Sequence, residues 1–450
     1  MKLWSKSATV TNEAIERFTV GRDRELDLLL AEYDVAGSLA HGAMLHSINL
    51  LTGEEWQLLQ RHLRIIAGEI RLGHFRIADD VEDIHSQVEL LLTQRLGDVG
   101  KKIHSGRSRN DQVALDCKLF FREELRHIVL ATDALFTQLL RLAEAHKTTL
   151  LPGYTHLQIA MPSSFGLWFG AYSESLVDDV AMLLAAYRIV NKNPLGSAAG
   201  YGSSFPLNRR MTTDLLGFDD LNYNVIYAQM GRGKVERIIA QAVSSLAATL
   251  GKMAMDITLF MSQNFGFISF PDDLTTGSSI MPHKKNPDVF ELIRARCNRL
   301  QALPNEITLM TNNLPSGYHR DAQLLKEAMF PAFESMKSCL AIAEFSLKQI
   351  RVRTDILSDE RGKALYAYLF SVEAVNELAL QGVPFRDAYK RVGDDIAQNR
   401  FTPSGTVSHT HEGSIGNLCL DEIQSAMQEI LAEFPFERVT QAMKRLLGDE

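Results

Sequence analysis

Long stretches of the chain repeat apolar residues at helical spacing. Between Asn110 and Leu150 the apolar positions recur every three or four residues, as at Leu115, Leu119 and Leu125. All 13 prolines of the 450-residue sequence stand at or after Pro152, so none interrupts this stretch. At about 1.5 Å per residue, a continuous helix here would reach about 60 Å. The pattern therefore predicts one helix that is longer than a compact domain is wide.

Four more stretches show the same periodicity over similar lengths. They cover 162–190, with Pro162 placed to open the helix, 235–265, interrupted only by Gly251, 287–314, with a kink expected at Pro304, and 321–352, with Pro331 inside. Helices this long and apolar on more than one face cannot all be covered within one subunit. We therefore expect a bundle that packs against copies of itself.

Shorter helical patterns flank the long ones. They cover 23–39, 53–72 and 80–96 on the amino-terminal side and 358–380 on the carboxy-terminal side. A chain of this length exceeds what one hydrophobic core supports. The sequence thus predicts an all-α protein with an amino-terminal helical domain at 1–108, a central long-helix bundle at 109–357 and a carboxy-terminal helical domain at 358–450.

Composition narrows the class of protein further. Hydrophobic residues make up 46% and charged residues 23%, and the net charge is −8 with both signs interspersed, which argues against a nucleic-acid partner. The four cysteines are isolated, so neither a zinc site nor a disulfide framework is indicated. Residues 1–18 lack the apolar core of a signal peptide, and no apolar run reaches the length of a membrane span. We expect a cytoplasmic protein without a membrane partner.

Four polar, glycine-containing segments interrupt the helical patterns, and the third is the most informative. It reads GSSIMPHKKNPD from Gly277 to Asp288. Lys284 and Lys285 near a helix amino terminus would hold a carboxylate and the charge that develops when the adjacent carbon loses a proton. A serine in the flexible strip before them could act as the base. The alternative is a solvated turn.

The other three segments carry candidate binding groups. HSGRSRNDQ, from His104, supplies arginines for carboxylate recognition, although Ser108 or Asn110 could simply cap a helix. PGYTHLQ, from Pro152, contains His156, and a lone histidine in a loop is more often structural. SGYHRDAQLLKE, from Ser316, places Gln323 and Lys326 on one helix face after Tyr318.

Together these blocks resemble the argininosuccinate lyase family of the fumarase and aspartase superfamily. Residues 277–287 fit the superfamily signature GSSxMPxKxNP, and KKNPD, SGRSRNDQV, PGYTHLQ and EDIH (82–85) fit the argininosuccinate lyase blocks. The resemblance covers roughly residues 80–330. It implies anti β-elimination of argininosuccinate to arginine and fumarate, without a cofactor or metal. It also implies a homotetramer with a twenty-helix core, in which each active site takes its blocks from different subunits.

The resemblance also implies roles for individual residues. Ser278 corresponds to the base that removes the proton from the succinyl carbon, His156 to the histidine that assists protonation of the leaving guanidinium, and Glu291 to its carboxylate partner. Lys284 corresponds to a catalytic lysine that contacts the substrate carboxylate. The substrate-binding positions implied are Ser108, Arg109, Asn110, Thr155, His85, Asn286, Tyr318, Gln323 and Lys326.

The chain departs from the family pattern at a few positions. Arg232, Gly233 and Lys234 stand where the family usually has DRD, which reverses the local charge. His283 and Met161 each replace a common glutamine, and the family's amino-terminal substrate-binding serine has no secure counterpart near 18–21.

Two rival readings remain beside this one. Adenylosuccinate lyase, aspartase or fumarase would use related chemistry, but these families lack the combination of SGRSRND, THLQ and KKNPD. A non-catalytic structural paralogue is the second alternative, against which Ser278, His156, Lys284 and Glu291 are all present. The histidines of SHTHEG at 408–413 could suggest a metal but more often lie on exposed surface.

Overall fold

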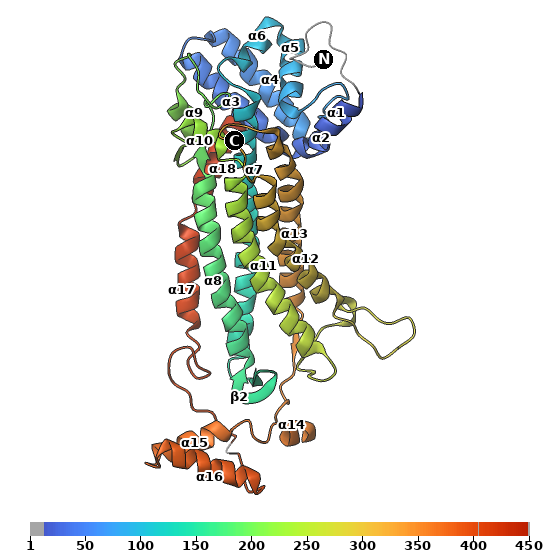
Figure 1. The fold of residues 1–450 in the computed structure, drawn as a ribbon, viewed down its shortest axis with the longest axis vertical. Helices are drawn as coiled ribbons and strands as arrows, with labels where there is room; N and C mark the ends of the chain where they lie inside the picture. The colour runs from blue at the N-terminus through green and yellow to red at the C-terminus, as the bar shows by residue number, and fades with distance from the viewer. Residues whose placement is uncertain (1–12, 404, 449–450) are drawn as a thin grey trace.

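The computed structural model describes residues 13–403 and 405–448, and five long helices dominate it (Figure 1). They are α7 (Arg109–Ala145), α8 (Phe165–Val190), α11 (Lys234–Met261), α12 (Asp288–Met310) and α13 (Leu324–Leu347). The predicted all-α class and the five predicted long helices are confirmed. Residues 1–12, most of the stretch without a signal-peptide pattern, lie outside the described residues.

Side-chain packing explains why these helices form one bundle. Leu125, Leu183 and Leu246 are fully buried in a single apolar core that runs through all five helices. α11 continues through Gly251, which faces α12: an added Cβ there would lie 3.4 Å from the Cβ of Cys297. α12 and α13 likewise continue through Pro304 and Pro331. Burial of the apolar faces outweighs the local cost of a glycine or proline.

Among the described residues, α11 is the one helix long and apolar enough to suit a membrane span. Its Ile239, Leu246 and Ile257 are fully buried, and it packs against α8 and α12 in the middle of the bundle. The apolarity of α11 is that of a core helix.

Shorter helices form a cap at the amino-terminal end of α7 (Figure 1). They are α1 (Glu13–Val20), α2 (Asp23–Asp27), η1 (Leu28–Leu30), α3 (Ala31–Ser47), α4 (Gly53–Arg71), α5 (Ile84–Leu96), α6 (Asp98–Lys101) and η2 (Lys102–His104). Their second apolar core includes Leu115 and Leu119 of α7, which joins the cap to the bundle.

A β-hairpin lies at the opposite end of the bundle, at the position where a helix was predicted to begin. β1 (Leu150–Thr155) pairs with β2 (Gln158–Ser164), and Pro152 lies opposite Pro162. The predicted start of the second long helix at Pro162 was therefore wrong by three residues. The Ser164 side chain accepts a hydrogen bond from the Leu167 N–H at 3.0 Å and caps α8, which begins at Phe165.

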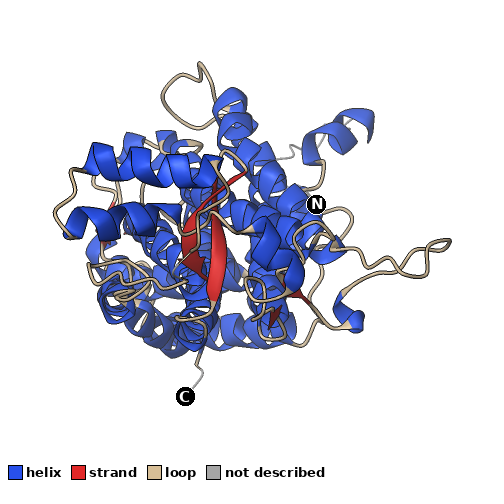
Figure 2. Cartoon of the chain, turned by 90° about the horizontal axis from the view of Figure 1, so that it is seen from below, coloured by secondary structure: helices blue, strands red, loops and turns tan. Residues whose placement is uncertain are grey.

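The segments that connect the long helices, and the chain after α13, contain the remaining elements. They are β3 (Lys192–Asn193), α9 (Arg209–Leu215), β4 (Asp220–Leu221), α10 (Val225–Met230), β5 (Ile268–Ser269), η3 (Asp272–Leu274), η4 (Arg320–Gln323), β6 (Arg351–Val352), α14 (Glu360–Leu365), α15 (Ser371–Leu380), α16 (Phe385–Ala397), α17 (Leu420–Ala432) and α18 (Phe436–Leu447). α15 and α16 lie beyond the hairpin, as Figure 2 shows from that end. α17 returns along α8, and α18 reaches α3. The predicted domain boundaries stay a prediction.

Candidate active site

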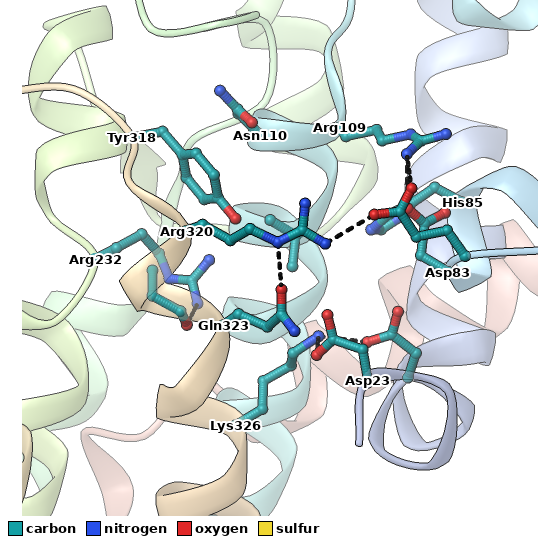
Figure 3. Close-up of a pocket in the computed structure, with 14 residues that line it drawn as sticks. Asp23, Asp83, His85, Arg109, Asn110, Arg232, Tyr318, Arg320, Gln323 and Lys326 are labelled. Carbon is teal, nitrogen blue, oxygen red and sulfur yellow. Dashed lines mark hydrogen bonds and ion pairs between the residues drawn. The ribbon is translucent and has the colours of Figure 1, made fainter. Parts of the chain in front are cut away.

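A charged pocket of about 190 Å³ lies where the cap meets the bundle (Figure 3). It brings together α2, the start of α5, the first turn of α7, Arg232 before α11, and the stretch from Tyr318 to Lys326. Six predicted binding residues line it: His85, Arg109, Asn110, Tyr318, Gln323 and Lys326. Residues from five distant parts of the sequence thus meet in one pocket.

Lys326 lies buried at the floor of this pocket. Its ammonium lies 2.6 Å from the carboxylate of Asp27 and 2.7 Å from that of Asp23, and its side chain is 5% exposed. Burial would lower the pKa of Lys326, but the two carboxylates outweigh it and raise that pKa. Burial also raises the pKa of Asp23 to about 6, although Lys326 opposes the shift. The pair of acids keeps Lys326 cationic and fixed in place.

Two arginines and two acids form the rim of the pocket. The Arg109 guanidinium lies 3.1 Å from Asp83 and 3.4 Å from Glu82. Arg320 crosses the pocket in Figure 3, pairs with Glu82 at 2.9 Å and donates to the Gln323 side-chain oxygen at 3.1 Å. Charges of both signs therefore alternate around the opening, which suits a ligand that itself carries carboxylates and cationic groups.

His85 presents a charged imidazole to the pocket. Its Nδ1 lies 2.7 Å from Asp34 and 3.4 Å from Asp116, both buried. Burial would lower the pKa of His85, but these carboxylates raise it to about 9. His85 is thus an imidazolium near pH 7 and pairs chiefly with Asp34, because burial and the neighbouring Asp34 raise the pKa of Asp116 well above its ordinary value.

Arg232 comes from the segment in which the local charge departs from the family pattern. Its Nε donates to Glu236 at 2.8 Å, and its guanidinium also donates to the backbone oxygen of Ala322 at 3.2 Å. Burial would lower the pKa of Arg232, but its interactions with Cys117, Glu236 and Tyr318 outweigh burial and raise that pKa. The structure places this guanidinium in the wall of the pocket, with its charge balanced by Glu236.

The first turn of α7 is positioned by a helix cap. The Ser108 hydroxyl accepts a hydrogen bond from the Asn110 N–H at 3.3 Å, and the Asp111 carboxylate accepts one from the Ser108 N–H at 2.8 Å. Asp111 also accepts from the N–H groups of Gly196 and Ala198. The capping interpretation of Ser108 is confirmed, and this cap directs Arg109 and Asn110 toward the pocket.

The serine segment lies elsewhere, on a loop between α11 and α12 that extends from the bundle in Figure 1. Thr276 and Asn286 pair across the base of the loop through two backbone hydrogen bonds, of 2.8 and 3.3 Å. The Ser278 hydroxyl accepts from the Met281 N–H at 3.1 Å and from the Ile280 N–H at 3.4 Å. Lys284 is exposed on the same loop. Glu291 follows in the first turn of α12, which begins at Asp288 rather than at the predicted Pro287.

His156 lies at a third place, the tip of the β-hairpin. His156 and Leu157 have φ angles of 55° and 57°, a left-handed pair that turns the chain between β1 and β2. Thr155 and His156 are exposed there. The tip is held at the far end of the bundle from the charged pocket (Figure 1). A single chain thus presents three separate groups of predicted site residues.

Several pocket residues were not among the predicted site residues. Asp23, Asp27, Glu82, Asp83, Arg232 and Arg320 all line the pocket. Glu82 and Asp83 belong to the EDIH block, and the i, i+4 spacing of Asp23 and Asp27 places both carboxylates on one face. This spacing is the sequence feature from which the two acids that hold Lys326 could have been predicted.

The comparisons with known proteins define the class first. A family model described as lyase matches residues 8–302, which places the chain in the fumarase and aspartase superfamily. Among solved structures, EDDS lyase in complex with formate has a TM-score of 0.72 at 22% identity, covering 98% of this chain and 96% of that one. At that identity the likeness concerns the fold alone.

Curated relatives identify the family within this superfamily. The argininosuccinate lyases of Bacteroides thetaiotaomicron and Parabacteroides distasonis are 62% and 60% identical, each over 99% of both chains. That of Stenotrophomonas maltophilia is 39% identical over 95% of this chain and 99% of its own. The chain belongs to the argininosuccinate lyase family, and it is a lyase.

Proposed function

We propose that the chain cleaves argininosuccinate into arginine and fumarate by anti β-elimination, without a cofactor. The observation that carries this proposal is the alternation of fixed cations and anions around one small pocket, with Tyr318, Gln323 and Lys326 on one side of it. Argininosuccinate itself carries carboxylates, an ammonium and a guanidinium, so each part of the ligand finds an opposite charge there.

In this proposal Ser278 is the base. Its oxygen would take the proton from the succinyl carbon, leaving a carbanion that is stabilised as the aci-carboxylate. The Met281 and Ile280 N–H groups already point at the Ser278 hydroxyl, where they would stabilise an alkoxide. Lys284 and Asn286 would hold the carboxylate that receives the developing charge.

The leaving group requires a proton from the opposite side. We propose that His156, supported by Glu291, donates this proton to the guanidinium nitrogen as the carbon–nitrogen bond breaks. His156 is exposed at the hairpin tip and Glu291 is 48% exposed, so both are open to a neighbouring subunit. Ser108 and Thr155 would contact the succinate side of the substrate.

We further propose a homotetramer with shared active sites, located in the cytoplasm. The three groups of site residues are separated within one chain, so only blocks from other subunits could complete the pocket. Large apolar side chains also lie exposed on the long helices: Met182 is 45% exposed, Met255 45%, Leu292 59%, Leu309 65% and Phe345 49%. Such side chains are expected at a subunit interface.

The direct test is to mix the purified protein with argininosuccinate and follow fumarate absorbance in the ultraviolet. We expect fumarate and arginine to appear in equal amounts. Adenylosuccinate, aspartate and malate serve as comparison substrates for the related lyases. No rise in absorbance, with the native oligomer confirmed by light scattering, would refute the proposed activity and favour the structural-paralogue alternative.

A further inference from the structure

A second cavity, of about 250 Å³, lies behind the active-site pocket. Its walls come from α7, α10, the end of α8 and the start of α11. Arg232 lines both the cavity and the active-site pocket and therefore forms part of the wall between them. None of the predicted catalytic or substrate-binding residues lines this cavity, so the proposed reaction leaves it without a role.

Lys118 of α7 lies in the wall of this cavity and is only 7% exposed. Its ammonium donates to the Lys192 backbone oxygen at 2.8 Å and to the Asn222 side-chain oxygen at 2.7 Å. Both acceptors are neutral, and no ion pair joins Lys118 to a carboxylate among the residues that the structure describes. An ammonium has three N–H donors. The charged form of Lys118 is thus buried with a spare donor and without a counter-ion, an arrangement that is costly unless an anion completes it.

The other charged groups of the cavity add to its positive character. Lys192 and Lys234 are exposed, and the Lys234 ammonium lies 5.4 Å from the centre of the Tyr227 ring. The cavity's one carboxylate among the described residues, Glu236, is already paired with Arg232. Two lysines without a carboxylate of their own thus accompany Lys118, so the cavity attracts anions.

The rest of the wall is apolar. Phe121, Ile189 and Ile238 face the cavity together with the Tyr227 ring. Its volume is slightly below that of pockets for drug-sized ligands, which start at about 300 Å³. An occupant would therefore be small, with one anionic group and an apolar or aromatic body.

We propose that this cavity is a second ligand site that binds a small carboxylate with an apolar or aromatic body, whose carboxylate pairs with Lys118. The same segment that departs from the family pattern, Arg232 to Lys234, supplies part of its wall. The replacement of the two acidic residues by Arg232 and Lys234 removes negative charge that would repel such a ligand. The departure from DRD would thereby change the charge of this second cavity, outside the active-site pocket.

Benzoate is a suitable probe, with benzamide as its neutral counterpart of the same shape. Calorimetry on the native oligomer should show saturable binding of benzoate and at least tenfold weaker binding of benzamide. Lys118→Met keeps the side-chain length and should weaken benzoate binding at least tenfold. Lys101→Met removes a lysine that is 62% exposed and should leave the affinity unchanged. Equal affinity of Lys118→Met and the unmodified protein would overturn the proposal.

A further variant separates this cavity from the active-site pocket. Lys326→Met removes the cation of the active-site pocket and should leave benzoate affinity unchanged. If Lys326→Met abolishes benzoate binding while Lys118→Met does not, the ligand sits in the active-site pocket and the proposed second site is wrong.

The unmodified protein provides a test that needs no variant. Burial lowers the pKa of Lys118 to about 7, with Glu236 opposing and Lys192 adding to the shift. Arg232, Lys234, Cys117 and Tyr227 complete the titratable groups of the cavity. Because the cationic form of Lys118 is lost as pH rises, benzoate affinity should fall severalfold between pH 6 and pH 8.5. An affinity that does not change with pH would contradict the role of Lys118.

Discussion

The individual site residues differ in how firmly the chain fixes them. Lys326 is held by Asp23 and Asp27 in a buried cluster, whereas Ser278 lies on an extended loop, where its contacts are to its own backbone. Binding groups on rigid elements are preorganised before the substrate arrives. In the proposed tetramer, by contrast, a partner subunit would bring the base to the substrate.

Replacement of the proposed base provides the first prediction. Ser278→Ala should fold normally, because the side chain is on an extended loop, and should lower kcat by at least about a thousandfold. Fumarate absorbance at saturating argininosuccinate measures the effect. Ser279→Ala, at the next position, is the matched control and should keep most of the activity. If instead Ser279→Ala is the inactive variant, Ser279 is the base.

The charge on His85 gives a prediction about pH. The folded-state pKa of about 9 is above the usual 6.5, because Asp34 and Asp116 outweigh burial. The ion pair therefore stabilises the fold fully below about pH 6.5, and this contribution, at most about 3 kcal/mol, is lost as pH rises through 9.

The variant that tests this pairing is Asp34→Asn. Thermal unfolding should show a larger loss of Tm at pH 6.5 than at pH 9.5, relative to the unmodified protein. Asp98→Asn, which removes an exposed partner of Lys101, should change Tm little and equally at both pH values. A loss of Tm for Asp34→Asn that is constant with pH would contradict a titration of His85 between these two pH values.

At the scale of the elements, periodicity predicted the five long helices but not the turn between α7 and α8. Helical spacing is a property of neighbouring residues, and it was strong enough for α7 and α11 to be recognised. The β-hairpin depends on pairing between residues 150–155 and 158–164, which no helical pattern reveals. Pro162, a good first helical residue in isolation, instead lies in β2 opposite Pro152.

The same distinction applies to the site. Motif blocks supplied six of the pocket residues, including Tyr318 and Lys326. Asp27 was missed because its role depends on Lys326, 299 positions later in the chain. A contact of that kind requires the folded arrangement of α2 and α13. The sequence motifs therefore predicted side chains that line the pocket, whereas only the folded structure shows the acids that hold Lys326 in place.

Gly233 provides a prediction about the junction between α10 and α11. Its φ of 81° is left-handed, and an added Cβ would lie 2.6 Å from Thr311. Gly233→Ala should destabilise the fold by about 2 kcal/mol and raise KM, because the adjacent Arg232 would shift. Gly68→Ala is the matched control: a Cβ there meets nothing within 4 Å, and the change should stabilise α4 by about 1 kcal/mol. Chemical unfolding and KM for argininosuccinate measure both variants.

At the scale of the whole molecule, the separation of the three groups of site residues favours assembly. The serine loop and the hairpin tip both project from the bundle, away from the charged pocket of their own chain (Figure 1). Shared sites make a specific prediction about mixed oligomers.

Ser278→Ala and Lys326→Met should each be inactive alone, because each lacks one part of the site. When the two variants are dissociated, mixed and reassembled, some sites receive an intact loop from one chain and an intact pocket from another. With random mixing, activity should recover to about a quarter of the unmodified level. If both parts came from one chain, the mixture would stay inactive.

The length of α7 has a consequence for how this family can vary in sequence. α7 begins beside the charged pocket and leads to the hairpin that carries His156, so its 37 residues set a span of about 55 Å between two groups that would serve different sites in the proposed tetramer. Insertion or loss of even one residue within α7 would rotate everything beyond it by about 100° and move the hairpin tip out of a neighbour's site. Insertions and deletions within the family should therefore occur in surface loops. The number of residues in α7 should stay constant, because it fixes the distance between the proposed catalytic centres.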